Sequence, residues 1–344
     1  MKLLSLLCTL LLAGCFFSDK PEAPLEFQGS AFGAYYKVKY ISGPTTPSPL
    51  ALQAEIEDFS NQYDQEFSLW KNDSFITQFN LSENREAQVV SQLAIDLSLE
   101  SKKLYEASLG VFDPSIKSLV NLWGFGKDKA LSSPKDEETS KALKSVGFNL
   151  LEIDQEKKTW RKKIPTLQLD FNSIAPGQVS DLISVLLQKR GVVHSLVDVG
   201  GELRAQGSRS DGQAWRVGIE KPSEVLGEAL MAIVPLSGGI ATSGSYRNYI
   251  ETPKGRISHT IDPRTGKQPI HQIVSATVIA PTALEADAWA TAVMVLGPEV
   301  MDQNSKIYQE IQNRKLAIYL IEVGADGQLI EHANSFMKEL WESK

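Results

Sequence analysis

The chain has 344 residues, of which 42% are hydrophobic and 22% are charged. This is the composition of an ordinary globular protein, and it excludes collagen, a coiled coil and disorder throughout the chain. The net charge of −7 and the lack of a strongly basic block argue against nucleic acid as a partner. Both cysteines, Cys8 and Cys15, lie near the start of the chain, so the globular body has neither disulfides nor thiolate metal sites.

The N-terminus has the pattern of an export signal. A single lysine precedes an apolar run over residues 3–13, which is too short to span a bilayer comfortably and has the form of a secretory signal. The run ends in Leu-Ala-Gly-Cys at Cys15, which resembles the bacterial lipoprotein box, where the cysteine becomes the acylated first residue of the mature chain. We therefore expect a signal peptide over 1–14, a polar tether over 15–28, and a lipid anchor on the periplasmic side of a bacterial membrane. A plain signal peptide with a chance cysteine is the alternative.

The rest of the chain contains strand-like and helix-like segments. The expected strands are 36–40, 195–199, 215–219, 229–235, 273–280 and 316–323, and the expected helices are 52–63, 93–104, 179–187 and 284–296. Several strands follow one another without helices between them, which favours an α+β fold with antiparallel pairing over a doubly wound parallel sheet. We expect residues 29–344 to form a single large domain, with 127–146 as a surface excursion.

The segment 281–294 carries the most informative chemical pattern. Thr282 and Glu285 have the spacing of a capping box, so the helix begins at about Thr282. The helix is otherwise apolar on all sides, which predicts burial, but Asp287 and Thr291 lie one turn apart on the same face. A buried carboxylate needs a partner, and a carboxylate beside a hydroxyl suits a hard cation such as Mg²⁺. The alternative is an aspartate that the helix dipole favours near a helix start.

Residues 169–177 run directly into the helix expected from residue 179. The backbone N–H groups at such a helix start can hold an anion, and Asp170 can accept a hydrogen bond from a base or a ring N–H. The plainer alternative is that Asp170 and Asn172 only shape a turn.

Other segments have weaker patterns. His259 precedes a tight turn predicted for Asp-Pro-Arg-Thr-Gly, and a histidine at such a junction can be a general base, although a structural role is more common. The glycine-bearing stretches 198–202 and 237–246 permit a close approach of the backbone to a ligand. Trp70 and the run 123–126 can stack on a planar ring, although core packing is the more common reason for each.

Taken together and in order, these segments resemble the ApbE family, the FAD:protein FMN transferases. The matching pieces are 67–70 with Asn80, 110–114, 123–126, 169–177, 198–201, 241–246, 259–266 and 285–291. The resemblance covers residues 29 to about 325 and implies a mostly antiparallel sheet flanked by helices, related to the T-fold.

The resemblance also implies a reaction. The family cleaves the pyrophosphate of FAD and joins the FMN half, through its phosphate, to a Thr or Ser hydroxyl of an exported acceptor domain of a membrane redox complex, and AMP leaves. Such chemistry requires an in-line attack, a divalent cation and a group that takes the hydroxyl proton. The alternative is a relative that binds FAD, or hydrolyses it to FMN and AMP, without transferring flavin.

The resemblance implies roles for individual residues. The Mg²⁺ ligands would be the side chains of Asp287 and Thr291 and the backbone carbonyl of Ser173, and His259 is the candidate for proton transfer. The residues implied to contact FAD are Phe32, Trp70, Val111, Phe112, Asp113, Asp170, Pro176 and the backbone near Ile261.

The chain departs from the family pattern at three places. Pro176 stands where the family usually has a lysine that can touch the FAD phosphates or the adenine, although proline suits the first turn of a helix. The usual Thr-Met-Gly-Thr is replaced over 31–34, and Ser245 stands where aspartate is common. These changes leave the expected metal ligands intact and bear on FAD affinity and transfer.

Overall fold

A computed structural model describes residues 23–31, 33–126, 133–222, 230–245, 249–252 and 255–342. The predicted signal peptide, the lipidation site at Cys15 and the predicted flavin contact at Phe32 therefore lie outside the described residues. Within the described ranges, no helix combines the length and the apolarity that crossing a membrane requires.

The centre of the molecule is an eight-stranded sheet in the order β1-β2-β6-β7-β10-β13-β14-β15, and every neighbouring pair is antiparallel. Its strands are β1 Leu25–Ala31, β2 Ala34–Tyr40, β6 Ser195–Val199, β7 Glu202–Gln206, β10 Gly238–Gly244, β13 Ile273–Ala280, β14 Ala317–Val323 and β15 Leu329–Ala333. Smaller sheets are formed by β3 Gln88–Val89, β4 Leu151–Asp154 and β5 Thr159–Lys162, by β8 Trp215–Glu220 with β9 Leu230–Leu236, and by β11 Tyr249–Thr252 with β12 Gly255–Ser258. The predicted α+β fold with an antiparallel sheet is confirmed.

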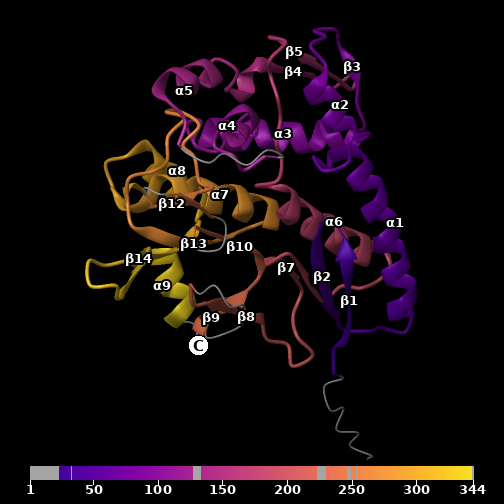
Figure 1. Ribbon diagram of the computed structural model, residues 1–344. Coiled ribbons are helices and arrows are strands. Elements are labelled where there is room, and N and C mark those ends of the chain that lie inside the picture. Colours follow the sequence, from indigo (N-terminus) through magenta and orange to yellow (C-terminus); the bar gives the residue numbers. More distant parts are fainter. Residues whose placement is uncertain are drawn as a thin grey trace, which may run out of the picture.

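The helices surround this sheet. They are α1 Pro49–Phe67, α2 Phe75–Leu81, α3 Gln92–Ala107, α4 Lys117–Leu122, α5 Asp136–Leu143, α6 Ala175–Lys189, α7 Ala283–Leu296, α8 Lys306–Arg314 and α9 Ser335–Glu342, with 3-10 turns at Phe148–Leu150 and Gly297–Met301. Figure 1 shows α6 and α7 between the large sheet and a layer that contains α3, α4 and α5.

The two faces of the large sheet are covered differently. On β2, Tyr36, Val38 and Tyr40 are fully buried in the main core, which α1, α6 and α7 complete. The opposite face packs against the β8–β9 hairpin and α9, with Trp215 and Met337 in a second core. The period-two pattern of the sequence therefore predicts this strand correctly, because one of its faces lies in the main core.

The start of the domain differs from the prediction. Strand β1 begins at Leu25, so residues 25–28, which the sequence assigns to the tether, belong to the sheet. Phe27 is buried and packs edge-on against Tyr36 and Tyr40, with ring centroids 6.4 and 6.1 Å away. Burial of this aromatic ring favours pairing of β1 with β2, and the composition of the segment alone does not reveal that contact.

Candidate active site

Helix α7 holds the predicted metal ligands in a fixed position. Its first turn is capped twice: the Thr282 hydroxyl accepts the Glu285 N–H at 3.1 Å, and the Asp181 carboxylate on α6 accepts the N–H groups of Ala283 and Leu284 at 3.0 and 2.9 Å. The predicted helix start at Thr282 is confirmed. The second cap could not be predicted from local sequence, since Asp181 is far from α7 along the chain.

A glycine lets α6 and α7 come into direct contact. A Cβ atom at Gly177 would lie 2.4 Å from the Ala283 carbonyl oxygen and 2.8 Å from the Asp287 Cβ, so no larger residue fits without displacement. The close approach allows the Gly177 N–H to donate to Oδ2 of Asp287 at 3.0 Å. The structure thus ties the segment 173–177 to Asp287, as the family resemblance requires.

The oxygen atoms expected to bind a cation are not used elsewhere among the described residues. Because Gly177 donates to Asp287, it leaves the Ser173 carbonyl without the hydrogen bond that it would accept in a regular helix. Within the described part of the chain, the second oxygen of Asp287 and the hydroxyl of Thr291 also have no hydrogen-bond partner. Thr291 lies one turn after Asp287 and is partly exposed, so it can face a ligand.

The first turn of α6 does not provide the predicted anion site. The Ala175 N–H donates to the Phe171 carbonyl at 2.8 Å, and Pro176 has no N–H to offer. The next two N–H groups donate to Asp287 and, from Gln178, to the Ile174 carbonyl at 3.0 Å. Every donor of this turn is therefore committed, and the expectation that it holds an anion is wrong. Pro176 fits in the first turn without disturbing the helix, as expected.

Asp287 is buried and faces a second carboxylate. The residue is 6% exposed, and burial raises its pKa well above the ordinary range, with a further contribution from the negative charge of Glu202. Burial also raises the pKa of Glu202 to about 7, and the charge of Asp198 adds to this shift. Glu202 is the first residue of β7, and its carbonyl accepts the Ser180 hydroxyl at 2.7 Å.

Sequence reasoning missed Glu202. The glycines of the stretch 198–202 predict only a close approach of the backbone to a ligand, and the acidic residues on either side of Gly200 and Gly201 are the available signal. A cavity of about 520 Å³ lies between β2, β6, β7 and β8, on the face of the large sheet that packs against the β8–β9 hairpin. Glu202 lines that cavity, together with Tyr35, Lys37, Asp198 and Arg216.

The donor set fits Mg²⁺. No group of three or more His, Cys, Asp or Glu side chains that could hold a metal occurs in the described part of the chain, so a histidine- or thiolate-rich centre is not supported there. The available donors are instead a carboxylate, a hydroxyl and a backbone carbonyl, which are the hard oxygen ligands that Mg²⁺ accepts. Among the residues that the structure describes, no basic side chain contributes to the pKa of Asp287. A bound cation would offset the repulsion between Asp287 and Glu202.

The residues predicted to contact flavin differ in exposure: Trp70 is exposed, whereas those over 111–113 are buried. Trp70 is 70% exposed at the end of α1, so its ring is available for stacking. Val111 and Phe112 are buried in the main core, which leaves little of either side chain for a ligand. Asp113 is also buried; its Oδ1 accepts both the N–H and the hydroxyl of Ser115, at 2.8 and 2.6 Å, and burial raises its pKa to about 6.

Asp170 lies beside Asp113 in the fold, since its N–H donates to the Pro114 carbonyl at 2.7 Å. Its Oδ1 accepts the Asn172 N–H at 3.0 Å, which confirms the turn that the sequence predicts for these residues. Its Oδ2 lies 4.0 Å from Nζ of Lys117. Burial raises the pKa of Asp170, and the lysine charge partly offsets that effect.

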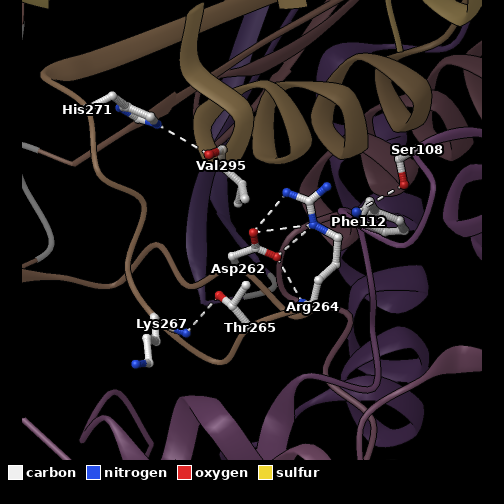
Figure 2. A network of polar contacts seen from close by, with 8 residues as sticks. All are labelled: Ser108, Phe112, Asp262, Arg264, Thr265, Lys267, His271 and Val295. Atoms are coloured by element: carbon white, nitrogen blue, oxygen red, sulfur yellow. Dashed lines mark hydrogen bonds and ion pairs between the residues drawn. The ribbon is translucent and has the colours of Figure 1, made fainter. Parts of the chain in front are cut away.

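The turn after His259 is built around an internal ion pair. Asp262 accepts the backbone N–H of Arg264 at 2.9 Å, and the guanidinium lies against both carboxylate oxygens, with Nη2 to Oδ2 at 2.9 Å (Figure 2). The predicted tight turn is confirmed. Its far end accepts the indole N–H of Trp123 at the Gly266 carbonyl, 2.9 Å away, so Trp123 packs in the protein and is not a free stacking ring.

His259 and Ile261 occupy the same region. Ile261 is buried with Trp123 in a small third core. The imidazole of His259 lies edge-on to Phe125, with ring centroids 6.1 Å apart, and remains partly exposed. This position is compatible with proton transfer and with a structural role.

Among the described residues, Asp287 is thus a buried carboxylate with no basic partner, and a carboxylate, a hydroxyl and a backbone carbonyl together are ligands that suit Mg²⁺ in chemistry at a phosphate. The ApbE family model matches residues 32–316. The chain therefore belongs to the ApbE family. A relative from Klebsiella pneumoniae (strain 342), named FAD:protein FMN transferase, is 37% identical over 325 residues, which are 92% of this chain and 91% of the relative.

Solved structures agree with this assignment. The apo form of the flavinyl transferase ApbE from Pseudomonas stutzeri has a TM-score of 0.81 at 34% identity, and the match covers 92% of this chain and 96% of that one. A histidine-to-glycine variant of the flavin transferase ApbE from Vibrio cholerae also has a TM-score of 0.81, at 32% identity, with 93% of this chain and all of the other covered.

Proposed function

We propose that this chain is an Mg²⁺-dependent FAD:protein FMN transferase. The proposal draws on the names of its relatives and on one structural observation. Among the described residues, the buried Asp287 carboxylate, fixed by the Gly177 N–H, has a free oxygen and no basic partner. The reaction transfers the FMN half of FAD to a Thr or Ser hydroxyl of an acceptor protein and releases AMP.

Each residue of the site has its own role in the proposed reaction. Asp287, Thr291 and the Ser173 carbonyl would hold Mg²⁺, and the cation would neutralise charge on the FAD pyrophosphate. The Gly177 N–H keeps one carboxylate oxygen of Asp287 in place, so the other points in a defined direction. The acceptor oxygen forms a bond to the phosphorus of the FMN half while the bond from that phosphorus to the bridging oxygen breaks, and AMP leaves with that oxygen. His259 takes the proton of the acceptor hydroxyl.

The decisive experiment uses the purified chain with FAD, Mg²⁺ and an acceptor domain that carries the threonine. Covalent flavin on the acceptor, detected by in-gel fluorescence and by mass, supports transfer. If the acceptor carries no covalent flavin and free FMN and AMP appear, the result supports hydrolysis instead. Hydrolysis is the second candidate because Pro176 supplies no cation and the first turn of α6 supplies no free N–H. The absence of all of these products contradicts both.

We also propose that the protein is a lipoprotein anchored through Cys15, and that its acceptors are exported domains of membrane redox complexes. The support for the anchor is the Leu-Ala-Gly-Cys box after a short apolar run. We expect Cys15→Ala to move the protein from the membrane fraction to the soluble periplasmic fraction. Unchanged fractionation of that variant would contradict the anchor without affecting the proposed reaction.

A further inference from the structure

Lys117 and Asp170 form an unusual pair at the start of α4. Lys117 is the first residue of α4, a position where the helix dipole disfavours a cation. Its side chain is only 16% exposed, and that of Asp170 is 10% exposed. The two segments are held together by the hydrogen bond from the Asp170 N–H to the Pro114 carbonyl. Helix stability therefore does not account for a lysine at this position.

The pair leaves polar atoms uncommitted. Its 4.0 Å separation is an ion-pair distance but too long for a direct hydrogen bond. Asp170 uses Oδ1 for the Asn172 N–H, whereas Oδ2 accepts no hydrogen bond from the described residues. Over the same described ranges, the Lys117 ammonium donates no hydrogen bond. A charged pair with this little exposure is costly unless further hydrogen bonds complete it, so this geometry favours a ligand between the two groups.

Other groups close to this segment are occupied. The N–H donors in the first turn of α6 are committed, and Pro176 has no side-chain donor. The guanidinium of Arg264 is paired with Asp262. Lys117 therefore presents uncommitted N–H groups next to the residue that the family resemblance assigns to FAD.

We propose that Asp170 and Lys117 together bind a heterocycle edge of FAD on which an N–H lies beside a ring acceptor. Oδ2 of Asp170 accepts the N–H, and the Lys117 ammonium donates to the neighbouring acceptor atom. Two partner atoms about 4 Å apart match such an edge, because each can form its own hydrogen bond of about 3 Å to adjacent ring positions. The inference rests on the proposed function, since it takes FAD as the ligand.

FAD has two edges of this kind. The isoalloxazine has an imide N–H between two carbonyl groups, and the adenine has an exocyclic amine beside a ring nitrogen. Both present the same pattern of donor and acceptor, so fragments of FAD decide between them. Riboflavin carries only the first edge and AMP only the second.

The test compares dissociation constants of FAD, riboflavin and AMP for the full chain and for Lys117→Met, measured by calorimetry and by flavin fluorescence. We expect Lys117→Met to weaken FAD binding at least about tenfold, as loss of a hydrogen bond from a charged donor does. The same loss should appear with only one of the two fragments. If it appears with riboflavin, the absorption bands of the bound flavin should also shift, because a cation no longer lies beside the ring carbonyl.

Matched variants keep the test decisive. Lys157→Met removes an exposed lysine that pairs with Asp154 on the surface, and it should leave all three constants unchanged. Lys117→Arg retains charge and donors and should restore part of the affinity, and it replaces Lys117→Met if thermal unfolding shows that the latter does not fold. Equal constants for the wild type and a folded Lys117 variant with all three ligands would overturn the inference. A wild type that binds no FAD contradicts the proposed function instead.

Discussion

Asp287 and Asp170 are both nearly buried carboxylates, and the protein compensates them in opposite ways. Asp170 has a lysine at 4.0 Å, whereas the pKa of Asp287 is raised by another carboxylate, Glu202, and is lowered by no basic neighbour among the described residues. A buried negative charge of the second kind is unfavourable in the isolated chain and becomes favourable when a cation binds. This difference agrees with the proposed roles, in which the α7 end of the site binds the cation and the α4 end recognises a ring of FAD.

Replacing Asp287 should have the largest effect. Asp287→Ala removes the central carboxylate, so we expect Mg²⁺-dependent flavin transfer to be abolished. Asp287→Asn should have the same effect while raising the melting temperature of the metal-free protein, because a neutral amide is cheaper to bury than a charge. Asp170→Asn is the control: it should weaken FAD binding, and the activity that remains should still require Mg²⁺. Full activity of Asp287→Ala, or loss of the Mg²⁺ requirement in Asp170→Asn, would contradict the different roles proposed for the two carboxylates.

Replacing His259 should separate chemistry from binding. His259→Asn should slow transfer at saturating FAD by about 100- to 10,000-fold, the usual range for loss of a general base, while the dissociation constant of FAD stays near that of the wild type. Single-turnover rates and equilibrium binding measure the two quantities separately. A collapse of FAD binding in this variant would show that the imidazole, which packs against Phe125, has a structural role.

The sequence predicts the parts of this site that depend on local patterns. Strands 195–199 and 273–280 have the predicted ends, and α7 begins after the predicted cap at Thr282, because periodicity and capping act over a few residues. Local patterns also indicate Asp287 and the segment after Asp170 as two separate candidate ligand-binding segments. The family resemblance supplied the link between them, and the hydrogen bond from Gly177 to Asp287 now supports it.

What the sequence could not reveal depends on contacts between distant segments. The charge of Glu202 acts on Asp287 because β7 and α7 both pack on α6, and Lys117 reaches Asp170 because their segments pair at Pro114. The wrong prediction of an anion site at the start of α6 has the same origin. A free N–H group at a helix start is a reasonable local expectation, but tertiary contacts decide whether it stays free.

The pH dependence of stability tests whether the carboxylate of Glu202 is destabilising at the α7 end of the site. Glu202 has a pKa of about 7 in the folded protein against an ordinary value of 4.5, so the folded state holds its proton more tightly than the unfolded state does. Its contribution to stability is therefore complete below pH 4.5 and is lost as pH rises through 7. Urea unfolding of the metal-free protein in EDTA should show this loss for the wild type and a smaller one for Glu202→Gln. If the free energy of unfolding falls equally with pH in the two proteins, ionisation of Glu202 does not destabilise the folded state.

Replacing Gly177, at the contact between α6 and α7, should have the smallest overall effect and the most specific effect on ligand binding. Gly177→Ala places a Cβ 2.4 Å from the Ala283 carbonyl, so the helices must separate, at a cost of about 1–3 kcal/mol in the free energy of unfolding. Separation of the helices also lengthens the hydrogen bond that orients Asp287, so Mg²⁺ affinity should fall. If Lys117 and Asp170 recognise the ring of riboflavin, its affinity should be retained, because that ring binds away from this contact. Gly43→Ala is the matched control, since a Cβ there meets only Thr46 at 3.8 Å. Parallel loss of Mg²⁺ and riboflavin affinity in Gly177→Ala would show that the two ends of the site are one cooperative unit, against the division that Asp287 and Asp170 suggest.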